Sequence, residues 1–126
     1  MLKAGQVQIW FPEAWRSPDG RLQRFLPGIG QLLLGSKVPA VPAYIGGAFE
    51  ALPRGRRVPR IRKITVVFGH PAPVDILRAA GAGRTDEERI SAGLQERVAA
   101  LGAASGTAAG AELPDPSLGR TDSIRR

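Results

Sequence analysis

The apolar residues of this chain are concentrated before about Leu101, and this distribution sets which part can fold. Residues 102–126 are mostly small and polar. Such a segment buries too little apolar surface to offset the entropy that is lost when a chain becomes ordered. The sequence therefore predicts one folded domain over residues 1–101 and a disordered tail over residues 102–126.

Expected strands that are separated by short helices predict an α/β fold, a mixed sheet with flanking helices. Strands are expected where β-branched and aromatic residues cluster, at Val7–Phe11, Val38–Ile45 and Ile61–Gly69. Two prolines within Val38–Ile45 favour a position at the edge of a sheet. The period of two in the last segment puts three apolar residues on one face, namely Ile64, Val66 and Phe68.

Two helices are expected. The first is Pro27–Leu34, opened by its proline and closed by Gly35. The second is Thr85–Leu101, which begins with a capping box: Thr85 is the N-cap and Glu88 follows three residues later. The apolar stripe of this second helix comprises Ile90, Leu94, Val98 and Leu101.

The composition excludes several kinds of protein. The chain has no cysteine, so it forms neither a disulfide nor a thiolate metal site. Its longest apolar stretch, Ile29–Leu34, is much shorter than the ~18–20 residues of a transmembrane helix. Residues 1–10 lack the continuous apolar region of a signal peptide. We expect a cytoplasmic protein without metal or cofactor, with a peripheral place on the inner face of the membrane as a further option.

The net charge of +7 at pH 7 indicates an anionic partner. The segment Arg54–Lys63 holds a third of the 18 basic residues and no acidic one. Its basic residues are Arg54, Arg56, Arg57, Arg60, Arg62 and Lys63. Either this segment is a solvated loop, or it faces anionic lipid headgroups, where each basic residue contributes about 1 kcal/mol. Nucleic acid is not an expected partner, because the segment has no aromatic residue and the best helix begins with acidic residues.

The segment Trp10–Ser17, WFPEAWRS, joins a strand end to a carboxylate and a guanidinium. Pro12 stops the strand, and Glu13 and Arg16 then follow three residues apart. The planar fork of Arg16 suits a phosphate or a carboxylate. Two charges at the end of a sheet need partners, so an ion pair between Glu13 and Arg16 that merely closes a loop is the alternative.

FPEAWRS resembles the third conserved block of the glycerophosphate and lysophosphatidate acyltransferases, F-P-E-G-T-R-S. Three residues follow at the family's spacing, namely Gly20, Phe25 and Gly28. Val38–Ala43, VPAVPA, is similar to the fourth block, V-P-x-x-P-V. Ile64–Pro71, ITVVFGHP, is similar to the family's late strand that ends in F-G-x-P. Together these features cover nearly all of the predicted domain, in the family's order.

The resemblance implies transfer of an acyl group from acyl-CoA or acyl carrier protein to a hydroxyl of a glycerol phosphate or a lysophospholipid. It implies that Glu13 and Arg16 hold the phosphorylated acceptor. The substrate-binding block as a whole would comprise Phe11, Pro12, Glu13, Arg16 and Ser17. The pocket for the acyl chain or the acceptor would be lined by Val38, Pro39, Val41 and Pro42.

The sequence departs from the family at the catalytic block. In the family, a histidine of a His-x4-Asp block lies upstream of the third block and acts as general base, and its aspartate orients the ring. No His or Asp precedes Trp10, and the only histidine, His70, lies in the late F-G-x-P segment, where we expect a structural or solvent-facing role. Leu2–Gly5 is typical of the last turn of a helix, and predicts that part of the domain is missing upstream. General base catalysis contributes ~10²–10⁴-fold, so we expect no catalytic residues and no activity in this chain alone.

Smaller departures concern the acceptor. Ala14 stands at the glycine position of the third block, which strains the backbone only where φ is positive. Trp15 replaces a threonine with a large aromatic side chain. A basic residue that the family often has just after Phe25 is missing, and Arg21 or Arg24 could take its place. The sequence thus predicts an acyltransferase-domain fragment, with a non-catalytic membrane-surface or partner-binding module as the alternative.

Overall fold

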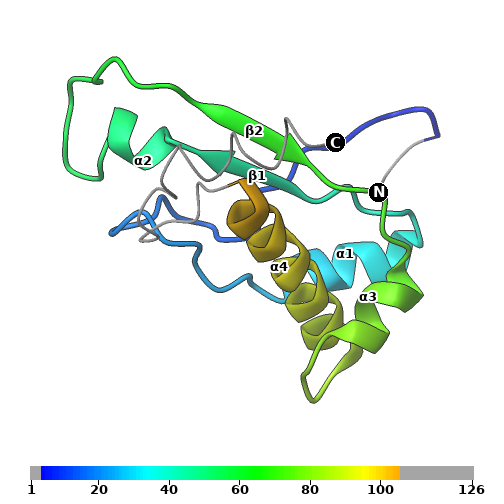
Figure 1. Ribbon diagram of the computed structural model, residues 1–126. Coiled ribbons are helices and arrows are strands. Elements are labelled where there is room, and N and C mark those ends of the chain that lie inside the picture. Colours follow the sequence, from blue (N-terminus) through cyan, green and yellow to red (C-terminus); the bar gives the residue numbers. More distant parts are fainter. Residues whose placement is uncertain (1–3, 106–126) are drawn as a thin grey trace, which may run out of the picture.

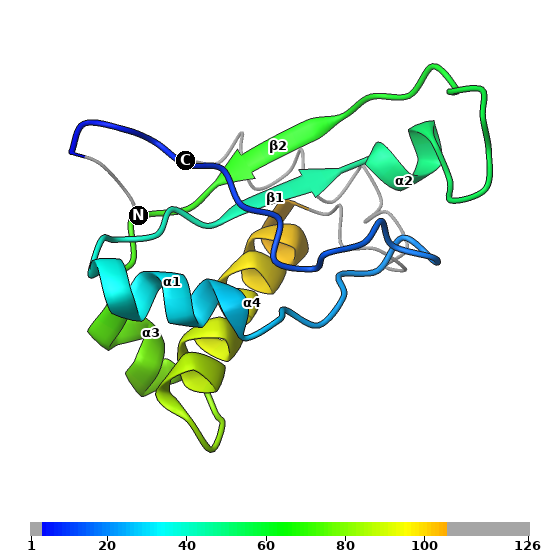
Figure 2. The ribbon, with the colours of Figure 1, turned by 180° about the vertical axis from the view of Figure 1, so that it is seen from behind.

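The computed structural model describes residues 4–105, which form a mixed α/β arrangement. The elements in chain order are α1 (Gly28–Ser36), β1 (Ala43–Gly46), α2 (Ala48–Ala51), β2 (Thr65–Phe68), α3 (Val74–Ala80) and α4 (Asp86–Ser105). Strands β1 and β2 form a hairpin on one side of the molecule, and α1, α3 and α4 pack together on the other (Figures 1 and 2). The predicted mixed sheet is wrong for the described residues, because their two strands pair antiparallel.

The core lies along α4, which contacts α1, α3 and both strands of the hairpin. Leu77 of α3 and Ile90 of α4 are completely buried. The predicted stripe of α4 is confirmed, since Ile90, Leu94 and Val98 are buried and Leu101 packs against them. Burial of an aliphatic side chain of this size stabilises a fold by roughly 1.5–3 kcal/mol. The other buried members of the core are Phe25, Ile29, Leu33, Tyr44 and Ala72.

Two glycines allow the helices to approach α4 closely. A Cβ atom at Gly30 of α1 would collide with the backbone oxygen of Glu87. A Cβ atom at Gly93 of α4 would collide with the backbone oxygen of Leu77 in α3. Because backbone cannot move aside as a flexible side chain can, these contacts require glycine.

The two expected helices form, with shifted ends. Helix α1 runs past Gly35 and ends at Ser36, because Lys37 adopts a left-handed conformation with φ of 54° and its N–H bonds to the Leu33 carbonyl. At the start of α4, the Thr85 hydroxyl accepts the N–H of Glu88 at 3.2 Å, as a capping box requires. The Glu88 carboxylate returns to the N–H of Arg84 at 2.8 Å rather than to that of Thr85.

The predicted C-terminal end of the domain changes. Helix α4 continues to Ser105, so residues 102–105 belong to the fold and not to a tail. The rest of the predicted tail, residues 106–126, lies outside the described residues, as do Leu2 and Lys3 of the predicted upstream helix turn. Gly5, the proposed stop of that turn, does have a positive φ of 76°.

The strand predicted at Val7–Phe11 does not form. Residues 6–11 have no regular structure, and Val7 is 94% exposed and Phe11 71% exposed. No described strand pairs with this segment, and an extended segment without a neighbour leaves its backbone groups to water. These residues favour a strand, but no neighbouring strand is present with which they could form a sheet.

The hairpin has one covered and one uncovered face. Ile45 pairs with Val66 and Ala43 with Phe68, so these residues share a face, and Tyr44 points to the other. The Tyr44 ring packs against Gly102 of α4. Ile64, Val66 and Phe68 share one face as predicted, but this is the exposed face. Within residues 4–105, no helix is long and apolar enough to cross a membrane.

Candidate functional site

The segment WFPEAWRS forms a tight loop that is fastened to the residues before α1. The N–H of Leu26 donates to the Pro12 carbonyl at 2.9 Å, and the N–H of Gln23 donates to Oε2 of Glu13 at 2.6 Å. Between these two bonds, Phe25 is buried in the core, and its N–H donates to the side-chain oxygen of Gln95 at 2.9 Å. The loop is thus held by the core although it lies at the surface.

A solvent-open hollow of about 390 Å³ lies beside this loop. Its lining comes from the loop itself, from the residues just before α1 and, from much further along the chain, from the start of the connection from α2 to β2. Its lining residues are Glu13, Trp15, Arg16, Pro18, Gln23, Arg24 and Arg54. The fold therefore brings the two charged residues of the predicted block together with two further arginines.

The hollow is electropositive. Within the described residues, the side chains of Arg16, Arg24 and Arg54 form no ion pair and no hydrogen bond. The expected alternative of an ion pair between Glu13 and Arg16 is therefore not seen. Glu13 is half-buried, and this burial raises the pKa of its carboxyl, while the hydrogen bond from Gln23 lowers it. The lining of the hollow thus holds three guanidinium groups and one half-buried carboxyl.

Ala14 has a left-handed backbone with φ of 64°. A Cβ atom in this region costs roughly 1–2 kcal/mol, which glycine avoids. The loop therefore requires a conformation that favours glycine at this position, and the F-P-E-G-T-R-S block has its glycine there. Strain at Ala14 was expected only for a positive φ, and the positive φ observed here meets that condition.

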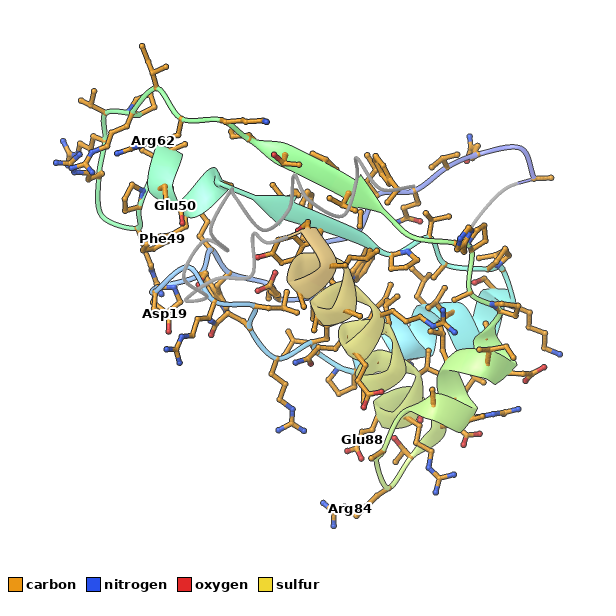
Figure 3. The ribbon with its side chains drawn as sticks, viewed as in Figure 1. Asp19, Phe49, Glu50, Arg62, Arg84 and Glu88 are labelled. Atoms are coloured by element: carbon orange, nitrogen blue, oxygen red, sulfur yellow. The ribbon has the colours of Figure 1, made fainter. Side chains whose placement is uncertain are left out.

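Ser17 serves the turn and does not line the hollow. Its Oγ lies 2.7 Å from the carbonyl oxygen of Arg21 and donates to it. Asp19 accepts the N–H of Arg21 at 3.0 Å, and this bond lowers the pKa of the Asp19 carboxyl. Gly20, with φ of 83°, lies against the ring of Phe49 in α2, and Figure 3 shows Asp19 below that ring. The turn thus rests on the helix that precedes the basic segment.

The remaining predicted residues lie elsewhere. Phe11 is exposed, and Pro12 contributes its carbonyl to the loop rather than a surface to the hollow. None of the four residues Val38, Pro39, Val41 and Pro42 lines the hollow. Val38 packs against the core, and the Pro42 carbonyl accepts the N–H of Gly69 at 2.8 Å. Their role as a lining for an acyl chain stays a prediction.

His70 was not expected to be the catalytic base, although an aspartate follows it. Four residues separate His70 from Asp75, which is the spacing of a His-x4-Asp block, although it lies downstream of WFPEAWRS rather than upstream. His70 is exposed, in agreement with the solvent-facing role that was expected. Asp75 pairs with Arg78 at 2.7 Å in the first turn of α3, and no hydrogen bond joins it to His70. This pair thus lacks the contact by which an aspartate orients a histidine base.

Arg24 was expected as a substitute phosphate contact along with Arg21. Arg24 does line the hollow, whereas Arg21 does not. Arg54 was expected only as part of the basic segment, and it borders the hollow through the fold alone. No sequence pattern links position 54 to position 16, so this residue could not be assigned to the site in advance.

The described residues offer no metal site, because no three of their His, Asp or Glu side chains gather closely enough to hold an ion. Comparisons with protein-family models, with curated proteins and with solved structures gave no match for this chain. The site must therefore be interpreted from its own geometry and charge.

Proposed function

We propose that this chain is the acceptor-binding part of an acyltransferase domain related to the glycerophosphate and lysophosphatidate acyltransferases, and that the hollow beside WFPEAWRS receives the acceptor phosphate. The observation that carries the proposal is the set of three guanidinium groups around one hollow, those of Arg16, Arg24 and Arg54, which form no ion pair within residues 4–105. Unpaired cations that converge from separate segments attract an anion.

Each side chain has a distinct part in this proposal. Arg16 offers a planar fork that matches two phosphate oxygens. Arg24 and Arg54 add positive charge from the other sides of the hollow. Glu13 supports the loop through Gln23 and does not itself contact the anion. Trp15, which is largely exposed and lines the hollow, provides an apolar wall for the glycerol backbone.

The conformation of Ala14 supports the relationship with the family. The positive φ at this position explains why a block of this shape has a glycine after its glutamate. This support comes from the backbone geometry, and it is therefore separate from the match of residue types in the block. The alanine of this chain is then a tolerated departure.

The proposed activity of this chain on its own is binding without turnover. Acyl transfer to a hydroxyl needs a general base, and the described residues contain no histidine that is hydrogen-bonded to a carboxylate. His70 and Asp75 lie outside the lining of the hollow. Acyl transfer would require a base supplied by residues other than those described.

Calorimetry with a short-chain lysophosphatidate tests this function, together with a turnover assay that adds acyl-CoA. We expect saturable binding of lysophosphatidate, no binding of the matching monoacylglycerol, and no phosphatidate. The variant Arg16→Ala should weaken binding at least tenfold, since a hydrogen bond to a charged group contributes about 1.5–3 kcal/mol. Arg84→Ala is the matched control, because Arg84 lies at the far end of the molecule (Figure 3).

The alternative, a non-catalytic module that binds a membrane surface or a partner, makes the opposite prediction for this assay. It expects no discrimination between lysophosphatidate and monoacylglycerol and no effect of Arg16→Ala. Formation of phosphatidate above background would contradict both, since either function leaves this chain without turnover.

A further inference from the structure

The connection from α2 to β2 contains the longest run of exposed residues in the described part of the chain. It extends from the end of the hairpin that points away from α1 and α3 (Figures 1 and 2). Every residue from Arg54 to Ile64 is exposed. The segment contains six basic residues and no acidic one, and Arg54 also borders the hollow described above.

Two aliphatic side chains lie within this basic segment and contact almost nothing. Val58 is 74% exposed and Ile61 is fully exposed. Neither position needs an apolar residue for the fold. The backbone beside them is nevertheless held in place, because the N–H of Arg60 donates to the Ala51 carbonyl of α2 at 2.6 Å. The two side chains are therefore presented outward from an anchored loop.

The apolar surface continues from the loop onto the hairpin. Ile64 follows Ile61 and is itself exposed, and Val66 and Ile45 then extend the uncovered face of the hairpin. The nearest acidic residue along the chain is Glu50 in α2, which Figure 3 shows beneath Arg62. The segment thus combines unopposed positive charge with aliphatic side chains that have no partner within the described residues.

We infer that residues 54–64 dock this end of the hairpin on an anionic lipid bilayer. Val58 and Ile61 insert at the level of the headgroups, and the arginines between and beside them pair with lipid phosphates. Interfacial segments combine apolar and basic side chains in this way, and their affinity depends on both.

A lipid surface fits these residues better than nucleic acid does. Arginine pairs with phosphate in either partner, but a nucleic acid offers no apolar layer for Val58 and Ile61. Single-stranded nucleic acids are bound by stacking on aromatic side chains, and the segment has none. The docking can be tested apart from acceptor binding in the hollow, because Arg54 is the only residue of this segment that also lines the hollow.

Co-sedimentation of the full chain with vesicles tests this inference. The vesicles are made of phosphatidylcholine alone or of phosphatidylcholine mixed with phosphatidylglycerol. The chain should bind the mixed vesicles and not the neutral ones. Arg57→Gln with Arg62→Gln should weaken this binding about thirtyfold, since each basic residue near an anionic surface accounts for about a fivefold change.

Val58→Ser with Ile61→Ser leaves every charge in place and should weaken binding at least tenfold, since the inserted aliphatic groups are removed. Arg84→Gln with Arg97→Gln is the matched control; it removes the same charge from the turn before α4 and from the middle of α4, and should have little effect. Because all substituted loop residues are exposed, the circular dichroism spectrum should not change.

Three results would overturn the inference. One is unchanged binding of the Val58→Ser, Ile61→Ser variant, which would leave only charge attraction. Another is an equal loss in the Arg84→Gln, Arg97→Gln control, which would indicate a dependence on net charge alone. The third is binding of a single-stranded oligonucleotide without binding of mixed vesicles, which would favour a nucleic-acid partner. Glycerol 3-phosphate binding in the hollow is independent of all three.

Discussion

The carboxylate of Glu13 and the backbone N–H of Gln23 lie 2.6 Å apart, and this hydrogen bond joins two of the segments that line the hollow. It uses the acidic residue of the WFPEAWRS loop as a support. The arginine of the same loop, Arg16, is left without an ion pair among the described residues. The two charged residues of the block, three positions apart, therefore have different tasks.

The first prediction concerns pH and Glu13. Burial raises the pKa of its carboxyl above 4.5, so the folded protein holds this proton more tightly than the unfolded chain does. The free energy of unfolding should therefore fall as pH rises through the interval between 4.5 and the raised pKa. Glu13→Gln keeps an acceptor for Gln23 without a charge to bury, and should remove this dependence.

Urea denaturation of Glu13→Gln and wild type across this pH range measures the difference. Glu50→Gln is the control, because Glu50 is exposed and makes no hydrogen bond within the described residues. The pKa values of Asp19 and Glu88 are lowered, so their contribution to the free energy of unfolding is lost as pH falls. This loss is the same in all three proteins. If Glu13→Gln were less stable than wild type above the raised pKa, the carboxylate would be a net stabilising group and our account of it wrong.

The second prediction concerns the strained backbone at position 14. Ala14→Gly should raise the free energy of unfolding by about 0.5–1 kcal/mol, because glycine relieves the left-handed strain but loses more entropy on folding. Ala82→Gly is the control; Ala82 lies in an exposed loop with a negative φ, so glycine there should destabilise. Chemical denaturation compares the two. A loss of stability in Ala14→Gly would contradict the conformation described for the loop.

The third prediction tests the packing of α3 on α4. Leu77 is completely buried between these helices, so Leu77→Ala should lower the free energy of unfolding by about 2–5 kcal/mol. The neighbouring Ile76 is 49% exposed, and Ile76→Ala should lose clearly less. Equal losses in the two variants would show that α3 does not pack through Leu77.

The fourth prediction concerns the uncovered face of the hairpin. Exposed apolar faces of this kind promote association, so the purified chain should self-associate as its concentration rises. Val66→Thr with Phe68→Thr should reduce this association, because threonine keeps strand propensity while removing apolar surface. Val7→Thr with Ile9→Thr changes apolar residues outside the hairpin that are even more exposed, and serves as the control. Light scattering that shows the same association in both double variants would count against this face as the cause.

The sequence predicted α1 and α4, the two longest described helices, but neither α2 nor α3. The stripe from Ile90 to Leu101 and the cap at Thr85 depend on neighbours within the helix, which a sequence shows directly. Helix α3 was missed because it has only one buried residue, Leu77, and therefore no stripe. The signals that were present are Pro73 before its start, Asp75 in its first turn and Gly81 after its end.

Strands and the site depend on distant partners, and prediction was weaker there. Val7–Phe11 has β-forming residues, yet a strand forms only where another strand supplies hydrogen bonds. The glutamate and arginine of WFPEAWRS were predicted as site residues from the resemblance of this segment to the family's third block. Arg54 joined them only because the fold brings the connection after α2 back to the loop. Whether Glu13 would pair with Arg16 or with a backbone N–H also depended on the position of Gln23.

The most direct test of the proposed acceptor site is an NMR titration of the ¹⁵N-labelled chain with glycerol 3-phosphate, with glycerol as the control. We predict saturable shifts at the amides of residues 13–16 and 23–24 with glycerol 3-phosphate alone, and loss of these shifts in Arg16→Ala. Shifts that do not saturate, that persist in Arg16→Ala, or that are confined to residues 56–63 would contradict the claim that this hollow binds the phosphate.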